Sequence, residues 1–243
     1  MCVMAKNIFL RFLIYMMRIS KAEFKILNND FMRFQTRITQ SKKQDNTYFV
    51  SQMNHFEKRY KKAGLENQFA ISIFTFAEKM DKLGINDLPG IIYSSLMKMP
   101  FIKSEVKELY ALKGLEYAQN QGDSIHTLAR LVDLEKIYKK NGNTHKYTRI
   151  LFQEEKVLVN ICSNFKNAKE SYKTYSREHS RLKKYETELA KTRVDIAKVI
   201  LNTNPKQAKI LLTKARKFFC SEKRNKEVDF VDLMLSELET KMT

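Results

Sequence analysis

The sequence predicts an all-α protein whose helices are joined by short turns. The chain has 243 residues, of which only 6 are glycine and 3 are proline. So few turn residues do not suit a many-stranded β fold. Hydrophobic residues make up 43% of the chain and charged residues 30%, which is typical of a globular protein. Apolar side chains recur every three or four residues and indicate about eight to eleven helices.

Residues 1–22 form a basic, apolar N-terminal segment that contains no acidic side chain. Its apolar run from Ile8 to Met17 is interrupted by Arg11 and is shorter than the roughly 20 residues that span a bilayer. Several interpretations stay open. The segment is an interfacial membrane anchor, an organellar presequence or one more buried helix, or the coding start is Met16 or Met17 and the segment is incidental.

Four helices are expected in the first part of the chain. A helix over 21–40 places one apolar face on Phe24, Ile26, Leu27, Phe31, Phe34 and Ile38. A second helix, over about 47–63, buries Phe49, Val50, Met53, Phe56 and Tyr60. Gly64 ends it with a left-handed C-cap. A third helix runs over 66–83, and a shorter fourth helix ends at Pro100.

The second part of the chain continues the same pattern. A helix over 103–121 is expected from the apolar residues Val106, Leu109, Tyr110, Leu112 and Tyr117. Asp123 or Ser124 caps the next helix, and Thr144 caps a helix that ends near Cys162. Residues 164–201 contain neither glycine nor proline, so one long helix or two helices with an unmarked break occupy them. Pro205 begins a helix through Phe219, and a last helix covers 227–241.

Two passages align without a gap, FEKRYKKAG at 56–64 and LEKIYKKNG at 134–142. Their spacing of a large apolar residue, an aromatic residue and a glycine resembles the first helix of the tetratricopeptide repeat. The matching residues are Phe56, Tyr60 and Gly64 in one passage and Leu134, Tyr138 and Gly142 in the other. The positions that correspond to the second helix of the repeat are Phe69, Ile73 and Phe76, then Tyr147, Leu151 and Glu154. Its small, bulky, small pattern is matched best by Ala208, Leu212 and Ala215.

The resemblance implies antiparallel helical hairpins stacked as a short α-solenoid, with an irregular helical bundle as the alternative. Phe69 and Tyr147 depart from the pattern because they replace small residues. Unrelated helix ends that share a glycine C-cap and a lysine-rich last turn would give the same match. We expect a helical repeat domain over 23–226 and an acidic capping helix over 227–243.

Signatures of catalysis and of metal binding are missing from the sequence. It contains no glycine-rich phosphate loop, no HExxH and no nucleophile elbow. The 3 cysteines form no CxxC pair, and the 4 histidines are scattered. Cys162 and Cys220 are interpreted as small core residues, and the pair Glu154–Glu155 as an exposed face. We therefore expect no enzyme, no metal and no cofactor, and a reducing, cytoplasmic environment.

The charge is strongly basic, with 45 Lys and Arg against 27 Asp and Glu and a net charge of +18. Much of the excess lies between Ser163 and Lys226, which favours acidic partners. The candidate contacts to phosphate or to an acidic partner are Arg177, Arg181, Lys183, Lys184, Arg193, Lys206, Lys209, Arg216 and Lys217. A solvated lysine face would have the same composition.

The first hypothesis for function is a non-catalytic module that binds a protein or peptide, as an adaptor, chaperone or scaffold. The alternatives are a nucleic-acid-associated protein that binds the phosphate backbone and a membrane-peripheral protein anchored by its N-terminal segment on anionic lipid. The oligomeric state is left open.

Overall fold

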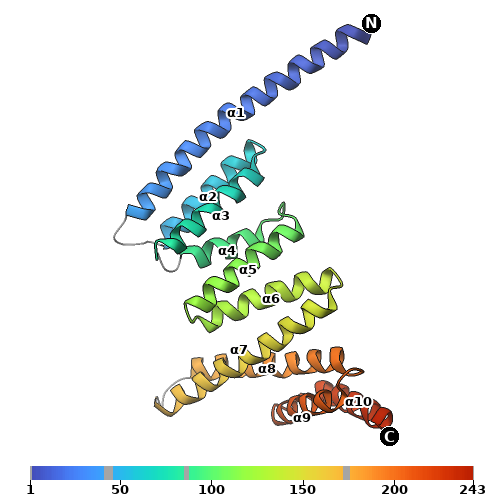
Figure 1. Ribbon diagram of the computed structural model, residues 1–243. Coiled ribbons are helices and arrows are strands. Elements are labelled where there is room, and N and C mark those ends of the chain that lie inside the picture. The colour runs from blue at the N-terminus through green and yellow to red at the C-terminus, as the bar shows by residue number, and fades with distance from the viewer. Residues whose placement is uncertain (1, 41–45, 85–87, 172–175, 243) are drawn as a thin grey trace. The chain divides into compact units, whose positions relative to one another are not determined.

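The protein is all-α, as the sequence predicts. Its computed structural model (Figure 1) describes the backbone of residues 2–40, 46–84, 88–171 and 176–242, and side chains within 21–40, 46–84, 88–167 and 180–240. In those ranges every regular element is an α-helix and none is a strand. The helices are α1 (Cys2–Gln40), α2 (Asn46–Lys62), α3 (Glu66–Lys82), α4 (Leu88–Lys98), α5 (Ser104–Asn120), α6 (Ser124–Lys140), α7 (Thr144–Ser171), α8 (Ser176–Ile200), α9 (Pro205–Ser221) and α10 (Asn225–Met242).

Most predicted helix limits are correct to within a few residues, and two segments differ from the prediction. The backbone of α1 is continuous from Cys2 to Gln40, so residues 2–20 belong to the same helix as 21–40. The helix expected to end near Cys162 continues to Ser171, and α8 then begins at Ser176. The long stretch without glycine or proline is therefore two helices. The residues between them, 172–175, lie outside the described part of the chain.

The chain divides into two compact units, Met1–Tyr110 and Ala111–Thr243, with the boundary inside α5. In the first unit α1 packs against α2, α2 against α3 and α3 against α4. In the second unit the same is true from α6 through α10. Packing between successive helices, each contacting its neighbours in sequence, is typical of a helical repeat-like fold.

Aromatic rings from α1, α2 and α3 form the core of the first unit. The ring centroid of Phe31 lies 5.2 Å from that of Phe56 and 5.9 Å from that of Phe69, both in edge-on geometry. The ring of Tyr60 lies 5.0 Å from Phe69. Such ring pairs add about 0.5–1.5 kcal/mol each to the stabilisation from burial. The predicted inward direction of these four side chains is confirmed.

Aliphatic side chains from α8, α9 and α10 form the main core of the second unit. Ile196, Leu212, Val231 and Leu238 are completely buried there. Ala208 and Ala215, predicted as small residues at close helix contacts, are also completely buried. A residue without a long side chain allows neighbouring helix backbones to approach, and Leu212 between them fills the groove.

One turn geometry recurs between the helices. At Gly142 the backbone φ is +66°, and the N–H of Asn143 donates to the carbonyl of Tyr138 at 3.0 Å while the N–H of Gly142 donates to Lys139 at 3.3 Å. This pair of bonds satisfies carbonyl groups that the helix end leaves free, and glycine adopts the required φ without strain. The same pair of bonds closes the turns at Gly64, Gly122 and Lys223.

Some apolar side chains that the periodicity placed in the core are exposed. They are Ile26, Val50, Val106, Leu109 and Leu112. Successive helix residues are rotated by about 100°, so two adjacent apolar residues cannot both face the same neighbour. In α1 the buried residue is Leu27, which leaves Ile26 60% exposed, and in α5 it is Tyr110, which leaves Leu109 exposed.

Two other predictions, one of a buried cysteine and one of a helix N-cap, are wrong by one position. Cys162 is buried as expected, but Cys220 is exposed because the adjacent Phe219 occupies the inward direction of α9. The N-cap of α7 is formed by Asn143, whose side-chain oxygen accepts the N–H of Lys146 at 3.1 Å. Thr144, expected to be the cap, is the first residue of the helix itself.

Candidate binding groove

A groove of about 600 Å³ lies in the second unit, between the C-terminal end of α5, α6 and α7. Its volume is in the range of about 300–1,000 Å³ that is usual for ligand sites. The lining residues are Gln119, Gly122, Ser124, Thr127, Leu131, Gln153, Lys156, Val157 and Asn160. The lining combines three side-chain amides, two hydroxyls and one cation, and it contains no carboxylate.

The pairing of α6 with α7 positions the two long walls of the groove. Thr127, which is 5% exposed, and the fully buried Leu131 fix α6 against α7. Near the start of α6, the side-chain amide of Asn160 donates to the hydroxyl of Ser124 at 3.2 Å. Lys156 and Gln153 lie one and two turns before Asn160, and the spacing of three and four residues places all three on one face of α7.

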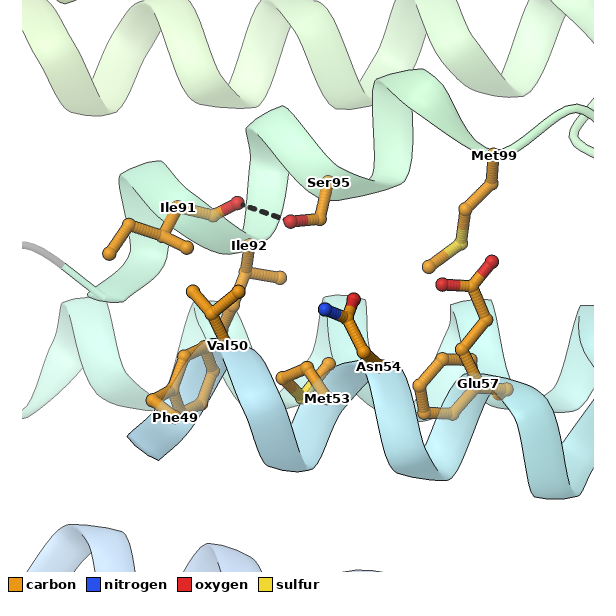
Figure 2. Close-up of a pocket in the computed structure, with 10 residues that line it drawn as sticks. Phe49, Val50, Met53, Asn54, Glu57, Ile91, Ile92, Ser95 and Met99 are labelled. Atoms are coloured by element: carbon orange, nitrogen blue, oxygen red, sulfur yellow. Dashed lines mark hydrogen bonds between the residues drawn. The ribbon is translucent and has the colours of Figure 1, made fainter. Parts of the chain in front are cut away.

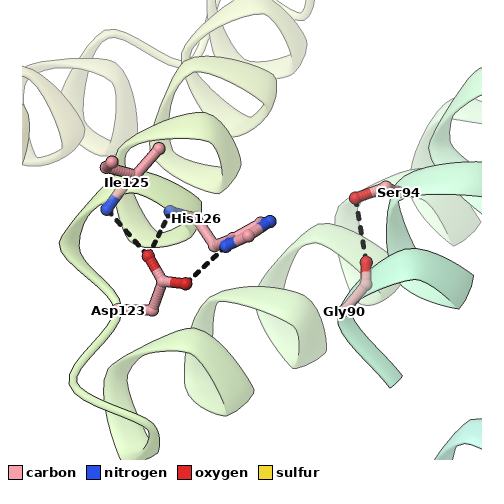
Figure 3. A network of polar contacts seen from close by, with 5 residues as sticks. All are labelled: Gly90, Ser94, Asp123, Ile125 and His126. Carbon is pink, nitrogen blue, oxygen red and sulfur yellow. Dashed lines mark hydrogen bonds and ion pairs between the residues drawn. The ribbon is translucent and has the colours of Figure 1, made fainter. Parts of the chain in front are cut away.

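The turn before α6 sets the end of the groove at which Ser124 lies. Asp123 is the N-cap, as predicted, and its Oδ1 accepts the backbone N–H groups of Ile125 and His126, each at 3.0 Å (Figure 3). Its Oδ2 lies 2.5 Å from Nδ1 of His126. Partial burial alone would raise the pKa of Asp123, but the backbone and ring contacts of His126 and the N–H of Ile125 outweigh it and lower that pKa. Asp123 is therefore an anion already engaged by its own helix.

Neither of the two acids of α7 that adjoin the lining residues lines the groove itself. Glu155 Oε1 accepts Nε–H of Arg193, on α8, at 2.9 Å. Glu154 is buried, with 3% of its surface exposed, so the predicted exposed face is wrong at this position. It lies between Leu151 and Leu158 on the buried stripe of α7, three residues after one and four before the other.

Glu154 is an unusual core residue because it is a carboxyl group on which the charges of three other carboxylates act. Its Oε1 has no hydrogen-bond partner within the described residues. Burial raises its pKa most, the charges of Glu135, Asp195 and Glu188 raise it further, and Lys136 lowers it, for a value of about 8. Glu154 is therefore mostly protonated at neutral pH. Being buried, it does not contribute a negative charge to the groove.

The basic residues predicted as contacts are divided between two roles. Four of them form ion pairs inside the unit. These pairs are Lys183 with Glu222, Arg193 with Glu155 at 2.9 Å, Lys209 with Glu239 at 2.8 Å, and Arg216 with both carboxylate oxygens of Asp232. The last two join α9 to α10, so part of the basic charge fastens the acidic C-terminal helix to its neighbour.

The remaining predicted cations do not form a single site. Arg181, Lys184, Lys206 and Lys217 are exposed and have no ion pair within the described residues. Lys206 and Lys217 lie eleven residues apart on α9, which is roughly 16 Å along the helix axis. The side chain of Arg177 lies outside the described residues.

A crevice in the first unit is too small to be a binding site. It has a volume of about 20 Å³, room for about one water molecule. Figure 2 shows side chains of α2 facing those of α4 across it. Its lining is mainly apolar and includes Phe49, Val50, Met53, Ile91, Ile92 and Met99. The hydroxyl of Ser95 donates within α4, to the carbonyl of Ile91 at 2.9 Å, so it is not directed at a ligand.

Two other kinds of site were tested in the described part of the chain. No group of three or more His, Cys, Asp or Glu side chains there could hold a metal ion. Among the same residues, no helix combines the length and the apolar character needed to cross a membrane.

The groove was not predicted from the sequence. The predicted contacts were chosen by positive charge, whereas most polar side chains in the groove are uncharged amides and hydroxyls. None of its lining residues is among the predicted contacts. A signal was nevertheless present in the sequence of α7. Arg149, Gln153, Lys156 and Asn160 recur at intervals of four, three and four residues, and this stripe has no acid.

Comparison of the chain with protein-family models found no matching family, and comparison with curated proteins found no matching relative. The resemblance to tetratricopeptide repeats therefore stays a prediction. The fold and the groove define the chain as an all-α, helical repeat-like protein with a polar groove in its second unit.

Proposed function

We propose that this chain is a non-catalytic helical-repeat protein that binds a partner protein through the groove between α5, α6 and α7. The observation that carries the proposal is the groove's lining of amides and hydroxyls around one cation. Side-chain amides both donate and accept hydrogen bonds, as a peptide main chain does. A protein segment in the groove would exchange its bonds with water for bonds to these groups.

The lining also supports a role in binding rather than in catalysis. It contains no histidine, cysteine or carboxylate, the side chains that most often act as general bases or nucleophiles. Glu154 has a raised pKa, which often accompanies catalysis, but it is buried and does not line the groove.

Site-specific photo-crosslinking in cells tests this function. A photoreactive phenylalanine analogue at Asn160 should form a crosslink to a discrete protein, whereas the same analogue at the exposed Lys214 of α9 should not. A further substitution, Gln153→Trp, fills the groove and should abolish the crosslink from position 160. Equal crosslinking from both positions, or no effect of Gln153→Trp, would contradict the proposal.

A second candidate function, binding to nucleic acid, rests on a different observation. Arg181 and Lys184 of α8 and Lys206 and Lys217 of α9 have no ion pair within the described residues. These cations are available to phosphates. Mixed-sequence RNA or DNA should then bind with an affinity that falls steeply between 50 and 200 mM salt, on the order of a thousandfold if six phosphates are contacted. The double substitution Lys206→Ala, Lys217→Ala should reduce that slope, and an unchanged slope would exclude these residues.

A further inference from the structure

We infer that the groove between α5, α6 and α7 accepts an extended segment of the partner protein that carries acidic side chains. This inference rests on the proposed function and adds the chemistry of the partner. It follows from the hydrogen-bonding groups in the groove, from the charges along α7, and from the length of the α7 stripe formed by Arg149, Gln153, Lys156 and Asn160.

The amides of the groove select an extended chain rather than a helix. A helix satisfies most of its own backbone groups, whereas an extended segment leaves its N–H and C=O groups free to pair. Gln119, Gln153 and Asn160 offer both donors and acceptors from the two sides of the groove. In the unoccupied groove the amide of Asn160 bonds to the hydroxyl of Ser124 at 3.2 Å. This exposed hydrogen bond is long and therefore weak, so both groups can exchange it for hydrogen bonds to a ligand.

The charges along α7 select acidic side chains. Lys156 lines the groove, and Arg149 lies on the same stripe of α7, two turns earlier. Both are exposed, and neither has an ion pair within the described residues. The acids beside the groove cannot neutralise them, because Asp123 caps α6 and Glu155 pairs with Arg193. Carboxylates brought by the partner therefore meet two cations that have no ion pair within the described residues.

The distance between the two cations of α7 predicts the spacing of the acidic residues in the partner segment. From Arg149 to Lys156 is seven residues, or about 10 Å along a helix. An extended or polyproline-type segment advances about 3.1–3.4 Å per residue, so carboxylates three residues apart match the two cations. From Arg149 to Asn160 the stripe is roughly 16 Å long, enough for about five residues of such a segment.

The same features disfavour a nucleic acid in this groove. Single strands are held by a row of cations that follows the phosphates and by aromatic side chains on which bases stack. The groove is lined by one cation and by no aromatic residue. A peptide with two separated charges matches Lys156 in the lining and Arg149 on the same stripe better than a strand with a charge on every nucleotide does.

Fluorescence anisotropy with the full chain and labelled decapeptides tests the inference. The probe is a Gly/Ser peptide with two glutamates three residues apart, and the comparison peptide has glutamine at both positions. We expect the glutamate peptide to bind at least tenfold more tightly. Lys156→Glu and Arg149→Glu should each reduce its affinity at least fivefold. The matched control, Lys226→Glu at an exposed position of α10, should change it less than twofold.

The remaining outcomes each overturn the inference. Equal affinity for both peptides, or no binding of either, removes the preference for acids. An equal loss with Lys226→Glu shows attraction to the net charge alone. Displacement of the glutamate peptide by an oligothymidylate, with the same dependence on Lys156, assigns the groove to phosphates.

The crosslink from position 160 to a partner protein is independent of these results, so the proposed function can stand even if the preference for an acidic partner is refuted. Circular dichroism melts of each variant verify that it is folded.

Discussion

Replacing the buried Glu154 with glutamine should stabilise the protein, increasingly so as the pH rises. Glu154→Gln keeps the shape of the side chain and removes its ability to ionise. In the wild type the carboxyl group is buried, the charges of Glu135, Asp195 and Glu188 act on it, and its pKa is raised from 4.5 to about 8. The glutamine amide stays neutral at every pH.

The size of the effect follows from proton linkage. Between pH 4.5 and about 8 the folded protein retains a proton on Glu154 that the unfolded chain has lost. Each pH unit in that interval therefore lowers the free energy of unfolding by about 1.4 kcal/mol. The loss is absent below pH 4.5, reaches about 3 kcal/mol at pH 7, and levels off near 5 kcal/mol above pH 8. Glutamine is subject to none of this loss.

Urea denaturation of both proteins at pH 5, 7 and 9 measures the difference. The free energies of unfolding should be close at pH 5 and should separate by several kcal/mol at pH 9, with glutamine the more stable. Glu237→Gln, at an exposed position of α10, is the matched control and should show no such separation. A difference between wild type and Glu154→Gln that stays constant from pH 5 to 9 would refute the reasoning, because Glu154 would then be ionised throughout.

Three further changes should have effects on stability that urea denaturation can measure. Tyr60→Phe should stabilise the protein by about 1 kcal/mol, because the buried hydroxyl has no hydrogen-bond partner within the described residues. A loss of stability would show that the hydroxyl is paired. Gly142→Ala should cost about 1 kcal/mol through its positive φ alone, since no atom lies within 4 Å of the added methyl group. Asn141→Ala, without that constraint, is its control. Asp123→Ala should cost about 1 kcal/mol at pH 7 through loss of the N-cap. Because the pKa of Asp123 is lowered on folding, this difference should shrink as the pH falls below 3.8, and a constant difference would contradict it.

The sequence was sufficient for the helices and for most of their turns. Gly142 followed by Asn143 specifies a helix end, since one residue adopts positive φ and the other caps the next helix. Phe31, Phe56 and Phe69 were placed in the core correctly, because large aromatic residues at helical spacing have few other stable positions. These features depend on local conformation and on apolar burial, which a single helix already determines.

The candidate site depends on which neighbour each helix face meets, and periodicity within one helix does not contain that information. Glu154 and Glu155 look alike in the sequence, yet Glu154 is buried and Glu155 pairs with Arg193 of α8. The groove likewise brings together residues of different helices, such as Ser124 of α6 and Asn160 of α7. Such contacts between helices cannot be predicted from the residue pattern of each helix alone.

The partners of the basic residues explain why the net charge of +18 is a poor guide to the binding site. Several lysines lie in the last turns of helices, as Lys139 and Lys140 do in α6, where positive charge interacts favourably with the helix dipole. Others, such as Arg216 with Asp232, fasten one helix to the next. A cation that is paired inside the protein is less available to a ligand, even where it lies in a basic region of the sequence. The informative cations are those without an internal partner beside a surface without acids, and Lys156 in the groove satisfies both conditions. In our proposal the amides around it favour an extended chain, and not merely any anion, as the ligand of this surface.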